Sequence, residues 1–129
     1  FQGNTGPFIQ YTYARISAIL RKAAQLGVAV ESIDYDAVNE VHQTEKDLIF
    51  TIGQYKEKLQ MAADTYSPAI MAQYVYDLAK EYNRFYTEIS IFNEDDAVLL
   101  QFRLALSALT AETIKVSMRL LGIEVPNRM

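Results

Sequence analysis

The sequence predicts an all-α fold, an antiparallel helical bundle, and three observations support that prediction. Apolar side chains recur at intervals of three and four residues, which is the period of a helix that buries one face. Proline stands near expected helix starts at Pro7 and Pro68, and glycine follows expected helix ends at Gly27 and Gly122. No segment resembles a sheet. The 129 residues are enough for one domain, 1-129, with a single core.

The first helix is expected to start near Thr5 and to run to Gln25, before Gly27. We expect Thr5 to cap its free amide groups and Pro7 to lie in its first turn, where a missing N–H is harmless. Two stripes share this helix, about 120° apart at 100° per residue. The core-facing seam contains Ile9, Tyr13, Ile16, Leu20 and Ala23. The second stripe contains Phe8, Tyr11, Arg15, Ile19 and Lys22.

The segment from 28 to 43 is the least regular, and its pattern fits an extended linker followed by a short helix. A second helix is expected to begin near Thr44 or Glu45, with a break or bend near Lys58. Its apolar face comprises Leu48, Ile52, Tyr55 and Leu59. Residues 61–66 either continue that helix or form a separate short one.

The next helix is expected from Pro68 to about Ile89. Its core seam is Met71, Val75, Leu78, Tyr82, Phe85 and Ile89, and its adjoining face is Tyr76, Ala79, Asn83 and Tyr86. The last helix is expected to be capped by Asn93 and to reach Leu121. It carries two apolar seams, which predicts the central position in the bundle. The seams are Leu99, Phe102, Leu106, Leu109, Val116 and Leu120, and Leu100, Leu104, Ala111, Ile114, Met118 and Leu121.

Charge is distributed unevenly along the chain, although the net charge of −4 is modest. Residues 1–30 contain three cations and no acid, residues 31–47 sum to −5, and residues 97–129 sum to +2. If the two basic ends meet in the fold, they form a side that faces phosphates while the acidic segment points away.

Several classes of function are disfavoured by the composition. The chain has no cysteine, which argues against a disulfide scaffold or a thiolate zinc site and agrees with a cytoplasmic location. The apolar runs fall short of a membrane span, and no secretory segment leads the chain. The lone His42 lacks metal-binding partners, and no serine has the glycine context of a hydrolase nucleophile. We therefore expect no catalytic residue, no metal and no cofactor in this chain.

Four blocks of sequence carry a family resemblance across nearly the whole chain. They are Gly3–Arg15, Tyr74–Tyr86, Arg103–Ala111 and the ending Leu120–Met129, which closes on Arg-Met. In this order they resemble the C-terminal, DALR-type anticodon-binding domain of arginyl-tRNA synthetase, a class I aminoacyl-tRNA synthetase. The resemblance implies a C-terminal fragment of a larger synthetase. Phe1 to Gly3 is either native or the remnant of a cleaved tag.

The resemblance implies recognition of the anticodon loop of arginine tRNA, with the catalytic domain of the same chain as the second partner and no membrane. The parent enzyme is expected to use ATP and Mg²⁺ to form arginyl-tRNA. The implied tRNA-binding residues are Phe8, Tyr11, Arg15, Asn83, Tyr86, Arg128 and Met129. Aromatic side chains stack on unpaired bases, and basic ones contact phosphates. Two alternatives remain: the related domain of cysteinyl-tRNA synthetase, and a non-catalytic helical module for protein interaction.

Overall fold

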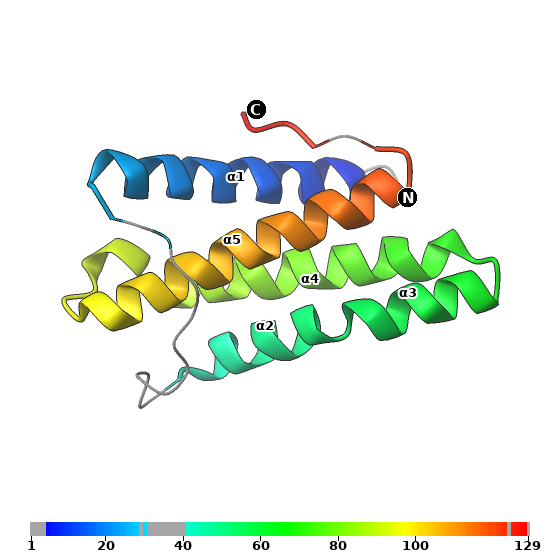
Figure 1. The fold of residues 1–129 in the computed structure, drawn as a ribbon, viewed down its shortest axis with the longest axis horizontal. Helices are drawn as coiled ribbons and strands as arrows, with labels where there is room; N and C mark the ends of the chain where they lie inside the picture. The colour runs from blue at the N-terminus through cyan, green and yellow to red at the C-terminus, as the bar shows by residue number, and fades with distance from the viewer. Residues whose placement is uncertain (1–4, 29, 31–40, 124, 129) are drawn as a thin grey trace.

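The computed structural model describes residues 5–28, 30, 41–123 and 125–128, and within them the chain forms helices and no strand (Figure 1). The elements are α1 (Thr5–Gln25), α2 (Gln43–Gly53), α3 (Tyr55–Asp64), α4 (Pro68–Glu88), the 3-10 turn η2 (Ile91–Asn93) and α5 (Ala97–Leu120). The all-α prediction is confirmed. Phe1 to Gly3 and residues 31–40, which make up most of the acidic segment and of the irregular stretch after residue 28, lie outside the described residues.

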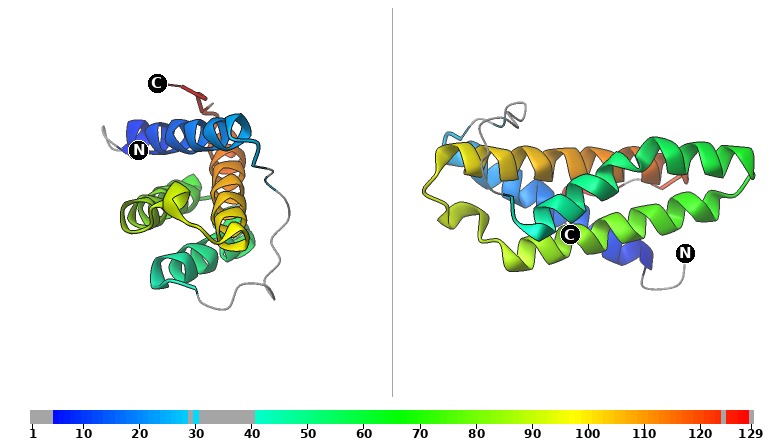
Figure 2. Two further views of the ribbon diagram at one scale, coloured as in Figure 1. Left: turned by 90° about the vertical axis from the view of Figure 1, so that its left-hand side faces the viewer. Right: turned by 90° about the horizontal axis from the view of Figure 1, so that it is seen from below.

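The bundle alternates in direction along the chain. α1, the α2–α3 pair, α4 and α5 each run opposite to the element before them (Figure 1). Because of this alternation, α1 and α4 run the same way and lie side by side, and α1 crosses the other helices obliquely (Figure 2). The side-by-side placement of α1 and α4 brings the second stripe of one helix against the adjoining face of the other.

α5 is the central helix, as predicted, and it packs against α1, α4 and the beginning of the α2–α3 pair. By length and apolar composition alone, α5 could span a membrane. The prediction that the apolar runs fall short of a membrane span therefore applies to uninterrupted runs and not to this helix as a whole. Half of that apolar stretch is buried in the bundle, which is the pattern of a core helix.

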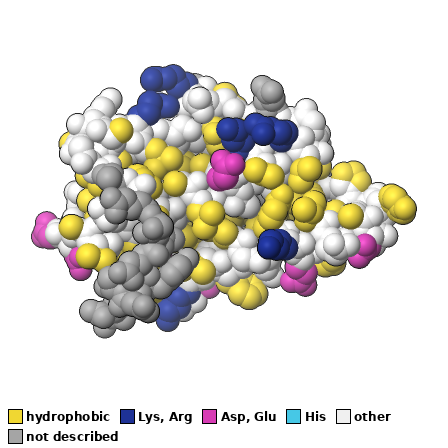
Figure 3. All heavy atoms as spheres, in the orientation of Figure 1, with side chains coloured by type: hydrophobic (Ala, Val, Ile, Leu, Met, Phe, Trp, Pro, Cys, Tyr) yellow, Lys and Arg dark blue, Asp and Glu magenta, His cyan; other side chains and the backbone are white. Residues whose placement is uncertain are grey.

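One predicted seam of α5 is only partly buried. Leu109 and Leu120 were expected in the core, yet their side chains are 43% and 56% exposed. The reason is geometric, because no described element covers this side of the second half of α5. Apolar side chains reach the surface along this face (Figure 3).

The boundaries of α1 agree with the prediction, with two corrections. Gly27 ends the helix with a positive φ of 74°, which favours glycine. Thr5 is the first residue of the helix and does not precede it, so it is not the predicted cap. Ile19 was assigned to the second stripe, but it is buried. It belongs to the buried core cluster and forms part of the floor of the cleft described below.

The helix predicted after residue 43 is divided at Gln54, earlier than the predicted break near Lys58. The Tyr74 hydroxyl of α4 donates hydrogen bonds to the carbonyls of Thr51 at 2.8 Å and Ile52 at 3.2 Å. Carbonyls at a helix end lack intrahelical partners, so this hydroxyl stabilises the break. The position of the break depends on this tertiary contact with α4, so the residue pattern within the helix did not predict it.

Asp96 caps α5, in place of the predicted Asn93. The Asp96 carboxylate accepts hydrogen bonds from the backbone N–H groups of Val98 at 2.9 Å and Leu99 at 3.3 Å. Asn93 instead ends the turn η2, where its amide donates to the Ser90 hydroxyl at 2.7 Å. The turn thus contains the residue that the sequence pattern had assigned as the cap of the last helix.

This correction leads to a test of stability. We expect Asp96→Ala to lower the free energy of unfolding by about 1 kcal/mol, because two amide groups lose their acceptor. Asn93→Ala serves as the matched control and is expected to change it by less than about 0.5 kcal/mol, since the side chain is exposed. Urea unfolding of both variants measures the difference. A larger loss of unfolding free energy for Asn93→Ala than for Asp96→Ala would indicate that Asn93 is the cap of α5.

A buried ion-pair network joins α2, α5 and the segment before α5. Arg103 Nε lies 3.4 Å from the carboxylate of Glu45, and Arg103 Nη1 lies 3.1 Å from that of Glu94. The Glu45 side chain is 1% exposed, and its other oxygen accepts the backbone N–H of His42. No pattern in the sequence indicates this network, because its members come from separate elements.

His42 is the N-cap of α2, which agrees with its interpretation as an ordinary polar residue near a helix start. Its ring accepts a hydrogen bond from the backbone N–H of Thr44, and Glu45 completes a capping box. Tyr82 of α4 is fully buried, and its hydroxyl donates a hydrogen bond to Ser107 at 2.9 Å. Burial raises the pKa of Tyr82, so this hydroxyl stays a donor.

Candidate nucleic-acid interface

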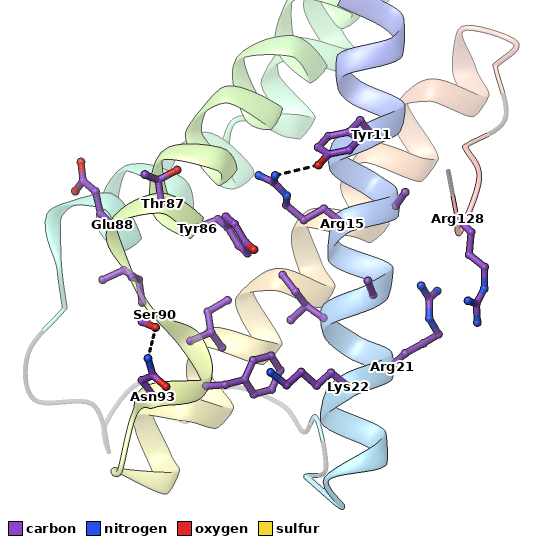
Figure 4. A pocket seen from close by; sticks show the side chains of 16 residues that line it. Tyr11, Arg15, Arg21, Lys22, Tyr86, Thr87, Glu88, Ser90, Asn93 and Arg128 are labelled. Carbon is purple, nitrogen blue, oxygen red and sulfur yellow. Dashed lines mark hydrogen bonds between the residues drawn. The ribbon is translucent and has the colours of Figure 1, made fainter.

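A cleft of about 1110 Å³ lies between α1 and the end of α4, and we call it the α1–α4 cleft (Figure 4). The turn η2 closes one end, and the C-terminal segment reaches it with Arg128. Its lining comprises Tyr11, Ala14, Arg15, Ala18, Ile19, Arg21 and Lys22 of α1, and Tyr86, Thr87, Glu88, Ile89, Ser90, Ile91, Phe92, Asn93 and Arg128. The second stripe of α1 therefore lines this cleft, except for Phe8.

Arg15 is at the centre of an aromatic cluster in the cleft. Its guanidinium carbon lies 4.4 Å from the ring centre of Tyr86 and 5.0 Å from that of Tyr11. It also donates a hydrogen bond to the Tyr11 hydroxyl at 3.2 Å. Both rings remain accessible, with Tyr11 50% and Tyr86 39% exposed. The three side chains that the sequence placed on two separate helices therefore meet, with ring surface available for a ligand.

Asn83 fixes the position of Arg15 from the α4 side. Its side-chain oxygen accepts a hydrogen bond of 2.6 Å from Arg15. Its amide donates to the Thr12 hydroxyl and to the carbonyl of Ala79, both at 2.8 Å. Both amide protons are thus used within the bundle. This arrangement suits a residue that orients Arg15.

Cations from both ends of the chain meet at the cleft, so the condition that was set for a side facing phosphates is met. Arg21 of α1 donates a hydrogen bond of 3.2 Å to the carbonyl of Asn127, which ties the C-terminal segment to α1. Arg128 lines the same cleft. No carboxylate of the described residues lies within ion-pair distance of Arg15, Arg21, Lys22 or Arg128. Glu88, the acidic residue of the lining, points away from Arg15 (Figure 4).

Two of the implied binding residues, Phe8 and Asn83, do not line the cleft. Phe8 is half-buried outside the cleft and packs edge-on against Tyr76 of α4, with ring centres 5.8 Å apart. Met129 is outside the described residues. For all seven implied residues, contact with RNA stays a prediction.

Three cationic or aromatic residues of the lining were not among the implied contacts, namely Arg21, Lys22 and Phe92. Lys22 stands over the Phe92 ring, with its ammonium nitrogen 4.5 Å from the ring centre. The stripe pattern of α1 already contained Lys22, so the signal for it was present. Phe92 had no such signal, because it belongs to the short turn between two helices.

The site offers binding groups and no evident catalytic set. Across the described parts of the chain, no three His, Cys, Asp or Glu side chains gather where they could hold a metal ion. Exposed aromatic rings beside unpaired cations form a surface on which unstacked bases and phosphates are bound in RNA-binding proteins. An all-α bundle with such a cleft defines the class of helical nucleic-acid-binding domains.

Within that class, the chain belongs to the DALR anticodon binding domain family, whose pattern matches residues 9–129. It is 50% identical over 129 residues to the arginine–tRNA ligase of Phocaeicola vulgatus and 51% identical over 130 residues to that of Flavobacterium psychrophilum. Both matches cover 100% of this chain, but 21% and 20% of the relatives. The chain thus spans about one fifth of their length.

A solved structure agrees with the family assignment. The arginyl-tRNA synthetase of Thermus thermophilus superimposes with a TM-score of 0.83 at 29% identity. The match covers 100% of this chain and 22% of that one. A putative arginyl-tRNA synthetase from Campylobacter jejuni gives a TM-score of 0.78 at 26% identity, over 95% of this chain and 26% of that one.

Proposed function

We propose that this chain is the anticodon-binding domain of an arginine–tRNA ligase and that the α1–α4 cleft binds the anticodon loop of arginine tRNA. The observation that carries the proposal is the meeting of Tyr11, Arg15 and Tyr86 in a cleft whose cations have no carboxylate partner among the described residues. The family membership and the names of the relatives support the same reading. Those relatives favour arginine over the cysteinyl alternative.

The mechanism is recognition and positioning. Unpaired anticodon bases stack on the exposed rings of Tyr11 and Tyr86, and each stack contributes on the order of 1–3 kcal/mol. Arg15, Arg21 and Arg128 neutralise the phosphates that accompany those bases. Arginine anticodons share a central cytosine, so the cleft discriminates at that base. The bound loop orients the tRNA so that its acceptor end reaches the catalytic domain.

Chemistry belongs to the rest of the enzyme in this proposal. A catalytic domain of the same chain uses ATP and Mg²⁺ to activate arginine and transfers it to the terminal ribose of the tRNA. This domain needs no cofactor for its part. We propose a cytoplasmic location, where the tRNA substrate is found.

The proposal is tested by binding of this chain to an arginine tRNA transcript and to a transcript with its central anticodon cytosine replaced. We expect the unchanged transcript to bind more tightly, by about 10-fold or more, because a mismatched base loses its stacking and hydrogen bonds. Fluorescence anisotropy over a series of salt concentrations measures both affinities. Equal affinities at every salt concentration would remove the anticodon assignment.

The salt dependence itself provides a second prediction. We expect Arg128→Gln to make the slope of log affinity against log salt shallower by about 0.7, the value for one phosphate contact with a single strand. The loss should be similar for both transcripts, since a phosphate carries no sequence information. Arg119→Gln is the matched control, because Arg119 is exposed at the end of α5 and outside the cleft. Equal slopes for the two variants would place Arg128 away from the RNA.

A further inference from the structure

The α1–α4 cleft contains the same kind of contact twice. Near one end, Arg15 of α1 lies over the Tyr86 ring at 4.4 Å. Near the turn η2, Lys22 of α1 lies over the Phe92 ring at 4.5 Å. All four side chains line the cleft. A cation and an aromatic ring are the two groups that bind one nucleotide of a single strand, through its phosphate and its base.

The two contacts are regularly spaced along α1. Lys22 follows Arg15 by seven residues, which is nearly two helical turns. Both residues therefore lie on the same side of α1, and their backbone positions are about 10 Å apart along the helix at 1.5 Å per residue. Stacked nucleotides rise about 3.4 Å each along a duplex strand, so 10 Å corresponds to about three nucleotides. A single stacked base cannot occupy both positions.

The Phe92 ring is held in place by its surroundings. Its neighbours Ile89 and Ile91 are buried, and the turn is closed by the hydrogen bond of 2.7 Å between Asn93 and Ser90. Phe92 itself is half-buried, so part of its ring remains at the surface beneath Lys22. Lys22 is exposed, with no acidic partner among the described residues. Its flexible side chain can leave the ring and follow a phosphate.

We propose that Lys22 and Phe92 form a second nucleotide-binding site in this cleft. This second site binds an unpaired nucleotide of the anticodon loop, about three positions from the nucleotide that stacks on Tyr86. The base stacks on Phe92, and the Lys22 ammonium moves to the adjoining phosphate. The cleft then holds a stretch of single strand. This inference rests on the proposed function, since it takes the same loop as ligand.

The test pairs protein variants with RNA variants. The RNA is an anticodon stem-loop of arginine tRNA in which each loop nucleotide in turn is replaced by an abasic one. Phe92→Leu keeps an apolar side chain of similar reach and removes the stacking surface. We expect it to weaken binding of the unmodified stem-loop about 5- to 100-fold. We expect no further loss on the RNA that lacks the base stacked on Phe92, because that interaction is already gone.

Controls separate this effect from loss of folding. Phe50→Leu alters an aromatic side chain on α2 that is 68% exposed and outside the cleft, and it should leave RNA binding unchanged. Lys22→Gln alters an exposed side chain and should preserve the melting temperature while making the salt slope shallower by about 0.7. If both Phe92→Leu and Lys22→Gln bind the stem-loop with the affinity of the wild-type chain, the second site is overturned. A loss for Phe92→Leu that is the same on every abasic RNA would also overturn it.

The outcome for the proposed function is read separately. If the wild-type chain discriminates the central cytosine but Phe92→Leu binds the stem-loop as tightly as wild type, the second site is wrong and the proposed function stands. If the wild-type chain binds both central bases equally but the effect of Phe92→Leu depends on one loop nucleotide, the anticodon assignment fails. The second site then stands as a site for single-stranded RNA. If the chain does not bind the stem-loop at all, both are overturned.

Discussion

Replacing Glu45 with alanine is expected to lower the free energy of unfolding by about 3 kcal/mol or more, the largest effect on stability that the structure predicts. Glu45 is fully buried, and its carboxylate pairs with Arg103 at 3.4 Å. Arg103 is itself 9% exposed. Removing the carboxylate leaves the guanidinium with Glu94 alone and also removes the acceptor of the His42 N–H. Urea unfolding followed by circular dichroism measures the loss.

A double-mutant cycle shows whether the cost comes from the pair or from the cavity. Replacing Glu45 by leucine and Arg103 by methionine together should cost less than the sum of the single replacements, because neither charge is then left unpaired. Glu112→Ala is the matched control on the exposed side of α5 and should change stability by less than about 0.5 kcal/mol. A Glu45→Ala variant as stable as this control would contradict the ion-pair network.

Replacing Tyr86 with alanine is expected to have the largest functional effect in the proposed arginine–tRNA ligase. The ring contributes exposed stacking surface and holds Arg15 at 4.4 Å, so its loss removes a base contact and releases the cation. We expect kcat/KM for charging of arginine tRNA to fall about 10- to 100-fold. Steps of ATP-dependent arginine activation that do not require tRNA should proceed at the wild-type rate, because the adenylate does not bind in the cleft.

The phenylalanine variant is the control for this prediction. Tyr86→Phe keeps the ring and loses only the hydroxyl, so charging should stay within about 3-fold of wild type. Charging assays on both variants, with arginine activation measured in parallel, complete the test. Unchanged charging by Tyr86→Ala would exclude Tyr86 as a contact. A parallel loss of activation would indicate a folding defect instead.

Most of the fold was predictable because its signals are local. The starts and ends of α1 and α4 follow from proline and glycine positions and from the spacing of apolar residues. The errors occurred where distant residues decide the outcome. The break at Gln54 depends on the Tyr74 hydroxyl of α4, and the exposure of Leu109 depends on which elements cover α5.

The cleft was predictable in part. The second stripe of α1 and the adjoining face of α4 were visible in the sequence, and they contain Tyr11, Arg15 and Tyr86. Phe92 was not predictable, because a residue in a short turn has no periodic pattern to mark it. The role of Asn83 in holding Arg15 also required coordinates, since a hydrogen bond of 2.6 Å joins residues 68 positions apart.

By itself, the sequence determined the helices, their order and the amphipathic stripes, because hydrogen bonding within a helix and the period of 3.6 residues act between near neighbours. Tertiary structure alone decided which stripes meet. The placement of α1 beside α4 forms the cleft, and the packing of α5 buries Arg103 against Glu45, 58 residues away. Such pairs depend on helix packing, in which contributions from the whole chain compete, and no local pattern records the result.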